Sequence, residues 1–296
     1  LDFYNLVFDL IAKQENITFF TDSLISFNEE ANKVTIICEK QNYSCDKLFN
    51  SIFNPEIVRS QTNYPLLSQH FIGWFVQTKE EVFNPDRATF MDFSIDQKGN
   101  TRFMYVLPTS TTEALLEPTL FSHHLLKKEE YEADIELYLK NLGVSEYKIN
   151  DKEQGNIPMT SYPFWKNNTK NIVNIGSAGG WTKASTGFTF RHTVKKSQAL
   201  VAFLSKETST PLSVTDFRKF HKKGKFWFYD LLFLDVLDKN NDLGSHVFSS
   251  LFKNGKTSLI FKFLDEETTY WEDLQIIFIC PKSLFLKALF DRVFGR

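Results

Sequence analysis

Apolar and polar positions divide the chain into a mixed first part, a strand-rich middle and a helical end. Residues 2–13 carry apolar side chains three and four positions apart, which predicts an amphipathic helix. Short β-type runs follow at 17–20, 24–27, 34–38 and 48–53. A helix followed by short strands favours the later part of a doubly wound α/β domain.

The middle of the chain is dominated by alternating patterns. Runs at 70–78, 89–95, 101–108 and 113–121 predict strands of one largely antiparallel sheet, after a linker at 55–65. Alternation within the third run predicts two faces, one with Phe103, Tyr105 and Leu107 and the other with Arg102, Met104 and Val106. A hairpin turn is predicted at Gln97-Lys98-Gly99-Asn100.

Helical patterns dominate the rest of the chain. Residues 127–142 predict a helix that ends at Gly143, and 172–176 predict a buried strand that enters a glycine-rich turn. From about residue 190 onward the pattern is helical, most strongly apolar at 226–237 and 283–294.

Composition excludes several classes of function. A net charge of −2 supplies no field for nucleic acid. Cys38, Cys45 and Cys280 form neither a disulfide framework nor a metal-binding spacing, and an odd count suits a reducing compartment such as the cytoplasm. His123-His124 point to opposite faces of a strand, so we expect no metal site. No apolar run reaches the ~18 residues of a membrane span, so any membrane contact is expected to be peripheral.

The first candidate site is the glycine-rich stretch after the buried strand. Gly176, Ala178, Gly179 and Gly180 let a backbone approach a ligand closely, and a following helix start would offer free N–H groups. Ser185, Thr186 and Gly187 continue the surface of small residues. A tight turn without a ligand is the alternative.

A second candidate combines aromatic side chains with isolated carboxylates. The stretch 69–74 (Gln-His-Phe-Ile-Gly-Trp) and Met91-Asp92-Phe93 predict an aromatic sheet, which suits either an ordinary core or an apolar tunnel. Glu117 follows Leu115 and Leu116 on a strand, where burial would raise its pKa and let it act as an acid. A position at a strand edge is the other interpretation.

These motifs in combination resemble the lycopene cyclases, densely from Gln69 to Phe190. The family carries QHFxGW, MDF, L-x-E-D/E-T, G-x-I-P-M-T and a late G-x-A-G-G-x-x-x-P-S-T-G-Y-x-F. This sequence departs from them at Pro118, where the family usually has a second acid, and at Ala184 and Phe188. The segment Ile157-Pro158-Met159-Thr160, preceded by Glu153 and Gly155, matches the fourth motif.

The resemblance implies an α/β (α+β) fold of the FAD-dependent hydroxylase type, with an antiparallel substrate-domain sheet and a helical C-terminal region. It divides the chain into part of an FAD-binding domain (1–60), a substrate-binding sheet (61–165), a return to the FAD domain (166–195) and a helical region (196–296). The family's N-terminal G-x-G-x-x-G turn is not in these residues. A βαβ unit of roughly 30 or more residues is therefore expected upstream.

The resemblance also assigns roles to residues. Glu117 would be the catalytic acid and base. The flavin would be held by Gly176, Ala178, Gly179, Gly180, Thr182, Ser185, Thr186 and Gly187. The substrate would contact Phe71, Trp74, Met91, Asp92, Phe93, Tyr105, Pro158 and Met159.

The implied reaction is a redox-neutral conversion of the ψ-ends of lycopene, or another linear carotene, to β-ionone rings. It requires reduced FAD, with NAD(P)H as the ultimate reductant. A basic cluster beside the apolar run 226–237 is either a solvated face or a contact with anionic lipid headgroups: Arg218, Lys219, His221, Lys222, Lys223 and Lys225. The alternatives are a hydroxylase or isoprenoid reductase of the same flavoprotein class, and a carotenoid-binding protein without flavin.

Overall fold

The computed structural model describes residues 2–30, 32–206, 215–220 and 224–295. Its N-terminal part begins with α1 (Asp2–Ile11) and an antiparallel sheet of β1 (Leu24–Glu30), β2 (Lys33–Cys38) and β3 (Asn42–Cys45). The strand predicted at 17–20 is absent because this run pairs with no neighbour among the described residues. The polar strand β3 lacks an apolar pattern and was not predicted.

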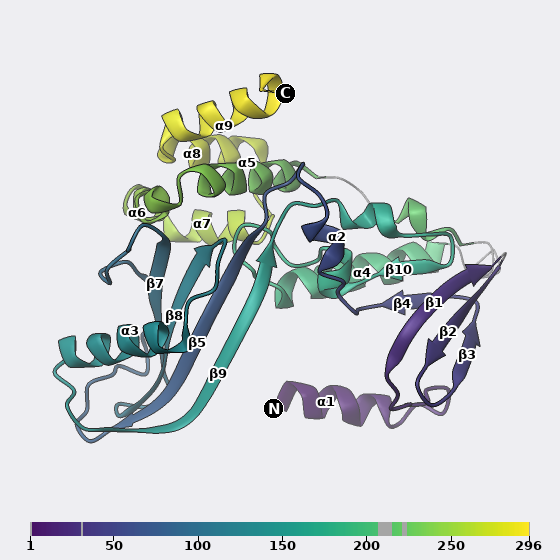
Figure 1. Cartoon of the computed structure of the whole chain (residues 1–296), viewed down its shortest axis with the longest axis horizontal. Coiled ribbons are helices and arrows are strands. Elements are labelled where there is room, and N and C mark those ends of the chain that lie inside the picture. The colour runs from purple at the N-terminus through teal and green to yellow at the C-terminus, as the bar shows by residue number, and fades with distance from the viewer. Residues whose placement is uncertain (1, 31, 207–214, 221–223, 296) are drawn as a thin grey trace.

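Two segments far apart in sequence meet in a small parallel sheet. Strand β4 (Leu48–Asn50) pairs with β10 (Ile172–Asn174), so that Leu48 lies opposite Ile172. The short helix α2 (Glu56–Arg59) lies within the predicted linker. The glycine-rich stretch that follows β10 is therefore held beside the N-terminal part of the chain (Figure 1).

The middle of the chain forms a five-stranded antiparallel sheet in the order β6-β7-β8-β5-β9. Its strands are β5 (Leu67–Thr78), β6 (Thr89–Asp92), β7 (Thr101–Pro108), β8 (Glu113–Ser122) and β9 (Tyr147–Met159). The predicted turn is confirmed, since Asn100 N donates to Gln97 O at 2.8 Å and Lys98 and Gly99 have positive φ. The edge strand β9 is largely polar, so the alternation of apolar residues does not reveal it.

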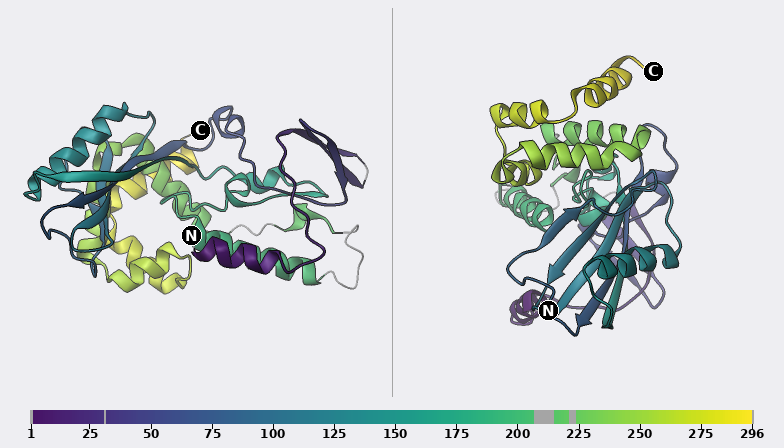
Figure 2. Two further views of the ribbon diagram at one scale, coloured as in Figure 1. Left: turned by 90° about the horizontal axis from the view of Figure 1, so that it is seen from below. Right: turned by 90° about the vertical axis from the view of Figure 1, so that its left-hand side faces the viewer.

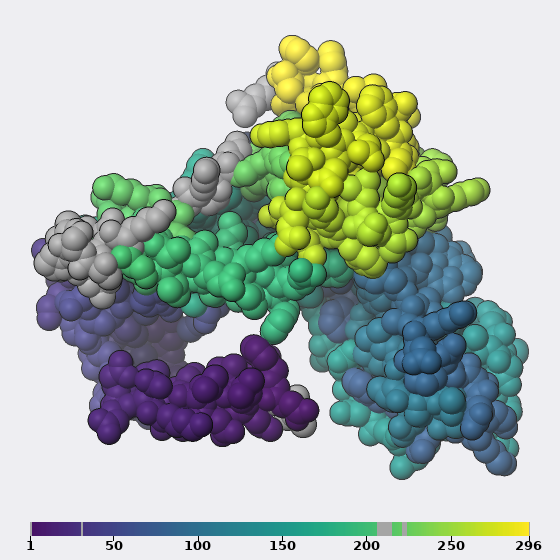
Figure 3. Space-filling model, turned by 180° about the vertical axis from the view of Figure 1, so that it is seen from behind, coloured from purple at the N-terminus to yellow at the C-terminus, as the bar shows by residue number. Residues whose placement is uncertain are grey.

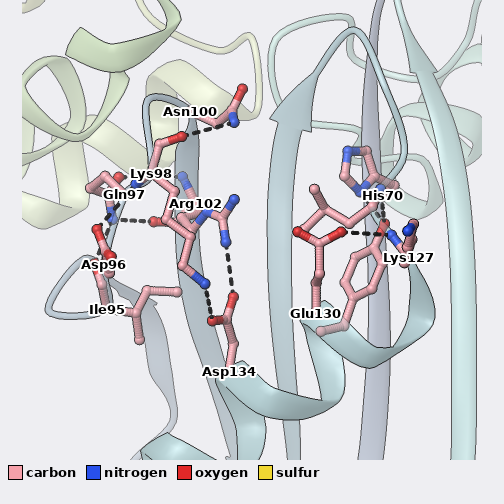
Figure 4. A network of polar contacts seen from close by, with 12 residues as sticks. His70, Ile95, Asp96, Gln97, Lys98, Asn100, Arg102, Lys127, Glu130 and Asp134 are labelled. Carbon is pink, nitrogen blue, oxygen red and sulfur yellow. Dashed lines mark hydrogen bonds and ion pairs between the residues drawn. The ribbon is translucent and has the colours of Figure 1, made fainter.

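One face of this sheet is covered by α3 (Lys128–Asn141). Apolar contacts join Met104, Leu116 and Trp74 to Ile135 and Leu139 of the helix. Figure 4 shows the polar contacts within this layer. There Arg102 Nη1 donates to Asp134 at 3.0 Å, and the His70 ring lies between Tyr131 and Ser122 at 2.6 and 2.7 Å.

The opposite face is covered at one end by the C-terminal helices (Figures 1 and 2). The helices of this region are α5 (Lys225–Lys239), α6 (Gly244–Asn254), α7 (Thr257–Leu264), α8 (Tyr270–Ile279) and α9 (Lys282–Phe294), whereas α4 (Phe190–Lys206) packs against Val173 and Trp181 near β10. Phe103 and Phe121 of the sheet pack against Leu234, Leu237 and Phe248 of α5 and α6. The predicted mixed fold, with an antiparallel sheet and a helical C-terminal region, is confirmed.

No helix in the described part of the chain has both the length and the apolar character of a membrane span.

Candidate functional site

The two faces of β5 separate residues that the sequence grouped together. Phe71 lies on the face away from α3, where its ring covers Gly155 of β9; a Cβ on Gly155 would lie 2.3 Å from Phe71 Cζ. Trp74 packs on the α3 side with Leu116, and Lys152 Nζ lies 4.6 Å from its ring centroid. Phe71 and Trp74, both predicted to contact the substrate, therefore lie on opposite faces of the sheet, because their positions differ by an odd number.

The same alternation separates Asp92 from its neighbours. Tyr138 of α3 donates to Asp92 Oδ2 at 2.8 Å, and Ser94 N donates to Oδ1 at 2.8 Å. Burial raises the pKa of Asp92, but these hydrogen bonds outweigh it and hold the pKa below its ordinary value. Met91 and Phe93 pack instead toward Phe248 in the core under α6. Asp92 thus anchors α3 and does not share a surface with Met91.

Glu117 lies on the face of β8 that points away from α3, opposite Tyr105 of β7. Thr119 Oγ1 donates to Glu117 Oε1 at 2.7 Å. Burial raises the pKa of Glu117 to about 7, and a hydrogen bond and the charge of Glu153 act in the same direction. Burial also raises the pKa of Tyr105, with a contribution from Glu117. Glu117 is therefore partly protonated at near-neutral pH.

Glu153 reaches this face from β9, and sequence reasoning did not identify it as a site residue. It lies opposite Gly73 of β5, the strand between β8 and β9. A Cβ on Gly73 would lie 2.9 Å from Glu153 Cγ and 2.8 Å from Leu115 Cδ1. The missing side chain of Gly73 leaves the space that Glu153 fills. Only the pairing of the strands reveals this, because Glu153 lies in a polar run.

The glycine-rich stretch does not continue directly into an α-helix. A 3₁₀ turn at Gly176–Gly179 follows β10, and α4 begins only at Phe190. Gly176 has φ +55° and open space where a Cβ would stand. By contrast, a Cβ on Gly179 would lie 2.1 Å from Asn174 O, and one on Gly180 would lie 2.7 Å from Phe164 Cδ2. Packing explains these two glycines, and Gly176 remains available to a ligand.

The other predicted cofactor residues border different spaces. Ala178 lines a cavity of about 490 Å³ beside β1 and β4. Thr182 lines one of about 240 Å³, and its hydroxyl lies 3.1 Å from that of Thr189. Ser185 and Thr186 line a cavity of about 500 Å³ among the C-terminal helices. The stretch thus passes between three cavities.

An unpartnered buried atom marks the point where this stretch meets the sheet. Gln69 Oε1 is buried, and no hydrogen bond to it is made within the described residues. A Cβ on Gly187, whose φ is +72°, would lie 2.1 Å from this oxygen. A buried acceptor without a donor is costly. An N–H group of a ligand would satisfy this oxygen, and Gly176 is a separate position at which a ligand could approach the backbone.

Buried charges fix the stretch in place. Lys183 Nζ contacts both carboxylate oxygens of Asp230, at 2.9 and 3.1 Å, and Glu266 at 3.2 Å. Burial lowers the pKa of Lys183, but the two carboxylates outweigh it and keep the pKa above its ordinary value. Nearby, burial lowers the pKa of His192. Lys183 therefore ties the stretch to α5 and to the end of α7.

Aromatic side chains join the sheet to the helices around Phe90, which the sequence did not indicate as a site residue. Its ring centroid lies 5.8 Å from Tyr105, 6.2 Å from Phe188, 5.7 Å from Phe252 and 5.6 Å from Phe261. Phe90, Met91 and Phe248 line a cavity of about 340 Å³. The Phe90 cluster, defined by these five aromatic residues, adjoins Glu117 through Tyr105.

The last predicted substrate residues end β9. Met159 is fully buried and packs with Leu67 in the core beneath α5, while Pro158 is half-buried opposite Ser68.

The basic cluster is partly neutralised where it is described. Arg218 pairs with Asp216 at 2.7 Å, and Lys225 pairs with Asp273. His221, Lys222 and Lys223 lie outside the described residues. The apolar run beside the cluster forms α5, whose Leu231, Leu234 and Leu237 are buried inside the protein.

Comparison with known proteins addresses the family and the fold. The sequence model of the family described as lycopene cyclase protein matches residues 13–289. A geranylgeranyl bacteriochlorophyll reductase-like protein from Thermoplasma acidophilum is similar in structure, with a TM-score of 0.65 and 12% identity over 99% of this chain and 74% of that chain. The halogenase PltM gives a TM-score of 0.48 and 12% identity over 100% of this chain and 68% of that one. No curated protein matches the chain in sequence.

Proposed function

We propose that this chain, which belongs to the lycopene cyclase protein family, closes the ψ-ends of lycopene or another linear carotene to β-ionone rings. The observation that carries the proposal is Glu117, a carboxyl whose pKa burial raises to about 7 on an aromatic sheet face. A protonated carboxyl group on an apolar face suits proton transfer to a hydrocarbon, which offers no polar group of its own.

The reaction needs one proton in and one proton out. Glu117 donates its proton to C2 of the terminal C1=C2 double bond, which leaves a cation at C1. The C5=C6 double bond attacks C1 and closes the six-membered ring. Loss of a proton from C6 to the carboxylate then gives the β-ionone ring. No electrons are exchanged with the substrate, and Glu117 returns to its acid form.

Aromatic side chains protect the cation in this scheme. Tyr105 and Phe90 lie next to the Glu117 face, and ring faces attract positive charge. They also exclude water, which would otherwise add to the cation and give a hydrated product. The raised pKa of Tyr105 keeps its hydroxyl neutral beside Glu117.

The proposed cofactor is reduced FAD, with NAD(P)H as the ultimate reductant. Gly176, with its open Cβ position, and the unpartnered Gln69 Oε1 are the features that suit a flavin. The chemistry that a bound reduced flavin supplies is electrostatic stabilisation of positive charge. In this proposal residues 1–60 and 166–195 belong to the flavin-binding region. Residues 61–165 form the substrate-binding sheet, and 196–296 form the helical region.

The substrate's remaining length would lie among the C-terminal helices. A cavity of about 500 Å³ there is lined mainly by apolar side chains, including Phe228, Phe233 and Phe263. Thr186 and Phe248 border both this cavity and the small space beside Tyr105. An apolar path from the Glu117 face toward α8 and α9 suits a long polyene.

The substrate's residence in lipid suggests a peripheral membrane contact at α8 and α9. Trp271 and Phe278 are 78% and 66% exposed, and Leu286, Phe290 and Phe294 are exposed as well. Ile277, Phe278 and Leu286 are exposed and also line the apolar cavity. We place the entrance for the carotene between these two helices, and not at the basic cluster before α5.

The experiment that tests the function is pigment analysis of lycopene-accumulating bacteria that express the full-length protein. We expect cyclic carotenes with the natural sequence and unchanged lycopene with Glu117→Gln, which keeps the shape but cannot donate an acidic proton. Glu113→Gln, the same change four residues earlier on β8, should retain cyclisation. Rings formed by Glu117→Gln would remove Glu117 from the mechanism. Unchanged lycopene with the natural, flavin-loaded protein would favour a reductase or hydroxylase.

A further inference from the structure

Gly73 creates a gap in the middle of the sheet through which two carboxyl groups meet. Glu117 and Glu153 lie on β8 and β9, which are separated by β5 and would ordinarily be kept apart by a β5 side chain. At Gly73 there is none, and the Glu153 side chain occupies the position, with Oε1 3.1 Å from where a Cβ would stand. The Glu153 carboxyl thereby reaches the face that carries Glu117, and its hydrogen bonding and its charge both raise the pKa of Glu117.

We propose that Glu117 and Glu153 form a hydrogen-bonded carboxyl pair that holds a single proton, with Glu153 as the positioning residue that keeps this proton on Glu117. The inference deepens the proposed function and rests on it for its catalytic meaning. Two carboxyl groups can be hydrogen-bonded to each other only while one of them is protonated. Two neighbouring carboxylates repel each other, so that loss of the last proton from the pair is disfavoured.

Among the residues that the structure describes, none that faces the pair is a neutralising cation. Tyr105 faces Glu117 from β7 and carries no charge while its pKa is raised. Thr119 supplies a neutral donor from β8 itself, and Gly73 contributes no side chain from β5. Lys152, adjacent to Glu153 in sequence, lies toward the other face over Trp74, and it pairs with Glu132 at 2.7 Å. The charge of Glu153 is thus directed at Glu117 without compensation.

The pair completes the proton cycle of the cyclisation. When Glu117 gives its proton to C2 of the polyene, the pair is left with two negative charges beside a cation. This arrangement favours the return of a proton from C6 to the pair, which restores the single shared proton. The substrate gains and loses one proton, and no oxidant or reductant takes part. A single buried glutamate could donate the proton, but the second carboxylate makes the return of a proton to the pair more favourable.

The pH dependence of cyclisation by the full-length protein tests this role. Activity should fall with rising pH as the pair loses its last proton. In Glu153→Gln the repelling charge is gone, so the pH at which activity falls should decrease by about one unit. At a fixed pH within that fall, this is a tenfold lower rate. Asp151→Asn, two residues earlier on β9, should leave the pH at which activity falls unchanged. A Glu153→Gln profile that is lower in height but unmoved in pH would overturn the inference.

Infrared titration of the protein without substrate provides a readout that does not depend on turnover. A protonated-carboxyl carbonyl band at neutral pH should be present in the natural protein. It should diminish in both Glu117→Gln and Glu153→Gln, and persist in Asp151→Asn. If this band behaves as expected while no rings form in the natural protein, the carboxyl pair stands and the cyclase function fails. If rings form but Glu153→Gln leaves the band unchanged, the cyclase function stands and the carboxyl pair fails.

Gly73→Ala supplies a second route if Glu153→Gln does not fold. It retains both carboxyl groups and places a methyl group in the gap, 2.9 Å from Glu153 Cγ. Glu153 must then move away from Glu117, and we expect the pH at which activity falls to shift in the same direction as in Glu153→Gln. Glu153→Asp keeps the charge but shortens the reach across Gly73, so it should give a smaller shift. An unchanged pH of this fall in Gly73→Ala would contradict the pair.

Discussion

At the residue scale, the raised pKa of Glu117 keeps a proton available to the substrate and lowers the stability of the folded protein. Its ordinary pKa of 4.5 is raised to about 7 in the folded protein, first by burial and then by Glu153. A carboxyl group in water would be ionised at pH 7, whereas this one is about half protonated. The hydrogen bond from Thr119 opposes the shift but does not cancel it.

This shift makes stability fall as pH rises. Below pH 4.5 the carboxyl is protonated in both folded and unfolded chains and contributes no pH dependence. Between 4.5 and about 7 the unfolded chain ionises first, so that the folded chain holds more protons and becomes less stable as pH increases. Above about pH 8 the deficit is complete, on the order of 3 kcal/mol.

Glu117→Gln should remove this deficit. We expect the variant to gain stability relative to the natural protein at pH 8 but not at pH 4, measured as the free energy of unfolding in urea at both values. Glu113→Gln serves as the matched control and should show no such difference between the two pH values. Equal effects of Glu117→Gln at pH 4 and pH 8 would show that its pKa is not raised.

At the element scale, the glycine-rich stretch shows that glycines in one motif serve different purposes. Gly179 and Gly180 allow close packing against Asn174 and Phe164, so larger residues there would damage the fold regardless of any ligand. Gly176 differs, because its Cβ position is open and its φ of +55° permits a backbone that most residues avoid. A substitution at Gly176 therefore tests ligand binding without disturbing the packing of the fold.

Gly176→Asn should therefore lower flavin content without unfolding the protein. Asparagine tolerates positive φ better than most residues and would place a side chain in the open space. We expect a several-fold fall in flavin absorbance per mole of purified full-length protein, with an unchanged melting temperature of the flavin-free form. Gly99→Asn is the control, since Gly99 has φ +75° and open space in the hairpin turn between β6 and β7. Full flavin occupancy in Gly176→Asn would exclude a close approach at this residue.

At the scale of the whole molecule, the parts that carry the proposed function are spread over its length. The space-filling view shows α8 and α9 at one end, and a hollow between α1 and the strand-rich body (Figure 3). The Phe90 cluster and the carboxyl pair lie between the helices and the sheet. In the proposed arrangement an apolar substrate enters from lipid at α8 and α9.

Binding to lipid vesicles tests this arrangement. Phe278→Glu combined with Leu286→Glu should weaken the affinity of the full-length protein for phosphatidylcholine vesicles, measured by flotation, by roughly tenfold per substitution. Each change removes apolar area that would be buried in the lipid. Leu137→Glu, at an exposed apolar position on α3, should have no effect. Equal flotation of the double variant and the natural protein would move the membrane contact elsewhere.

The sequence by itself determined most elements and the chemical character of the site. Alternation placed Phe103 and Tyr105 on one face of β7 and Met104 and Val106 on the other, as the two cores confirm. An apolar environment around Glu117 followed from Leu115 and Leu116. These properties are local, since side-chain direction in a strand and the effect of apolar neighbours depend on adjacent residues.

Only the tertiary structure decided which residues meet. The strand order β8-β5-β9 brings Glu153 to Glu117 over Gly73, and the same register turns Trp74 and Asp92 toward α3. The pairing of β4 with β10 sets the glycine-rich stretch beside the N-terminal sheet. Strand order and register depend on contacts between residues far apart in sequence, so a pattern read along one segment contains no information about its partner.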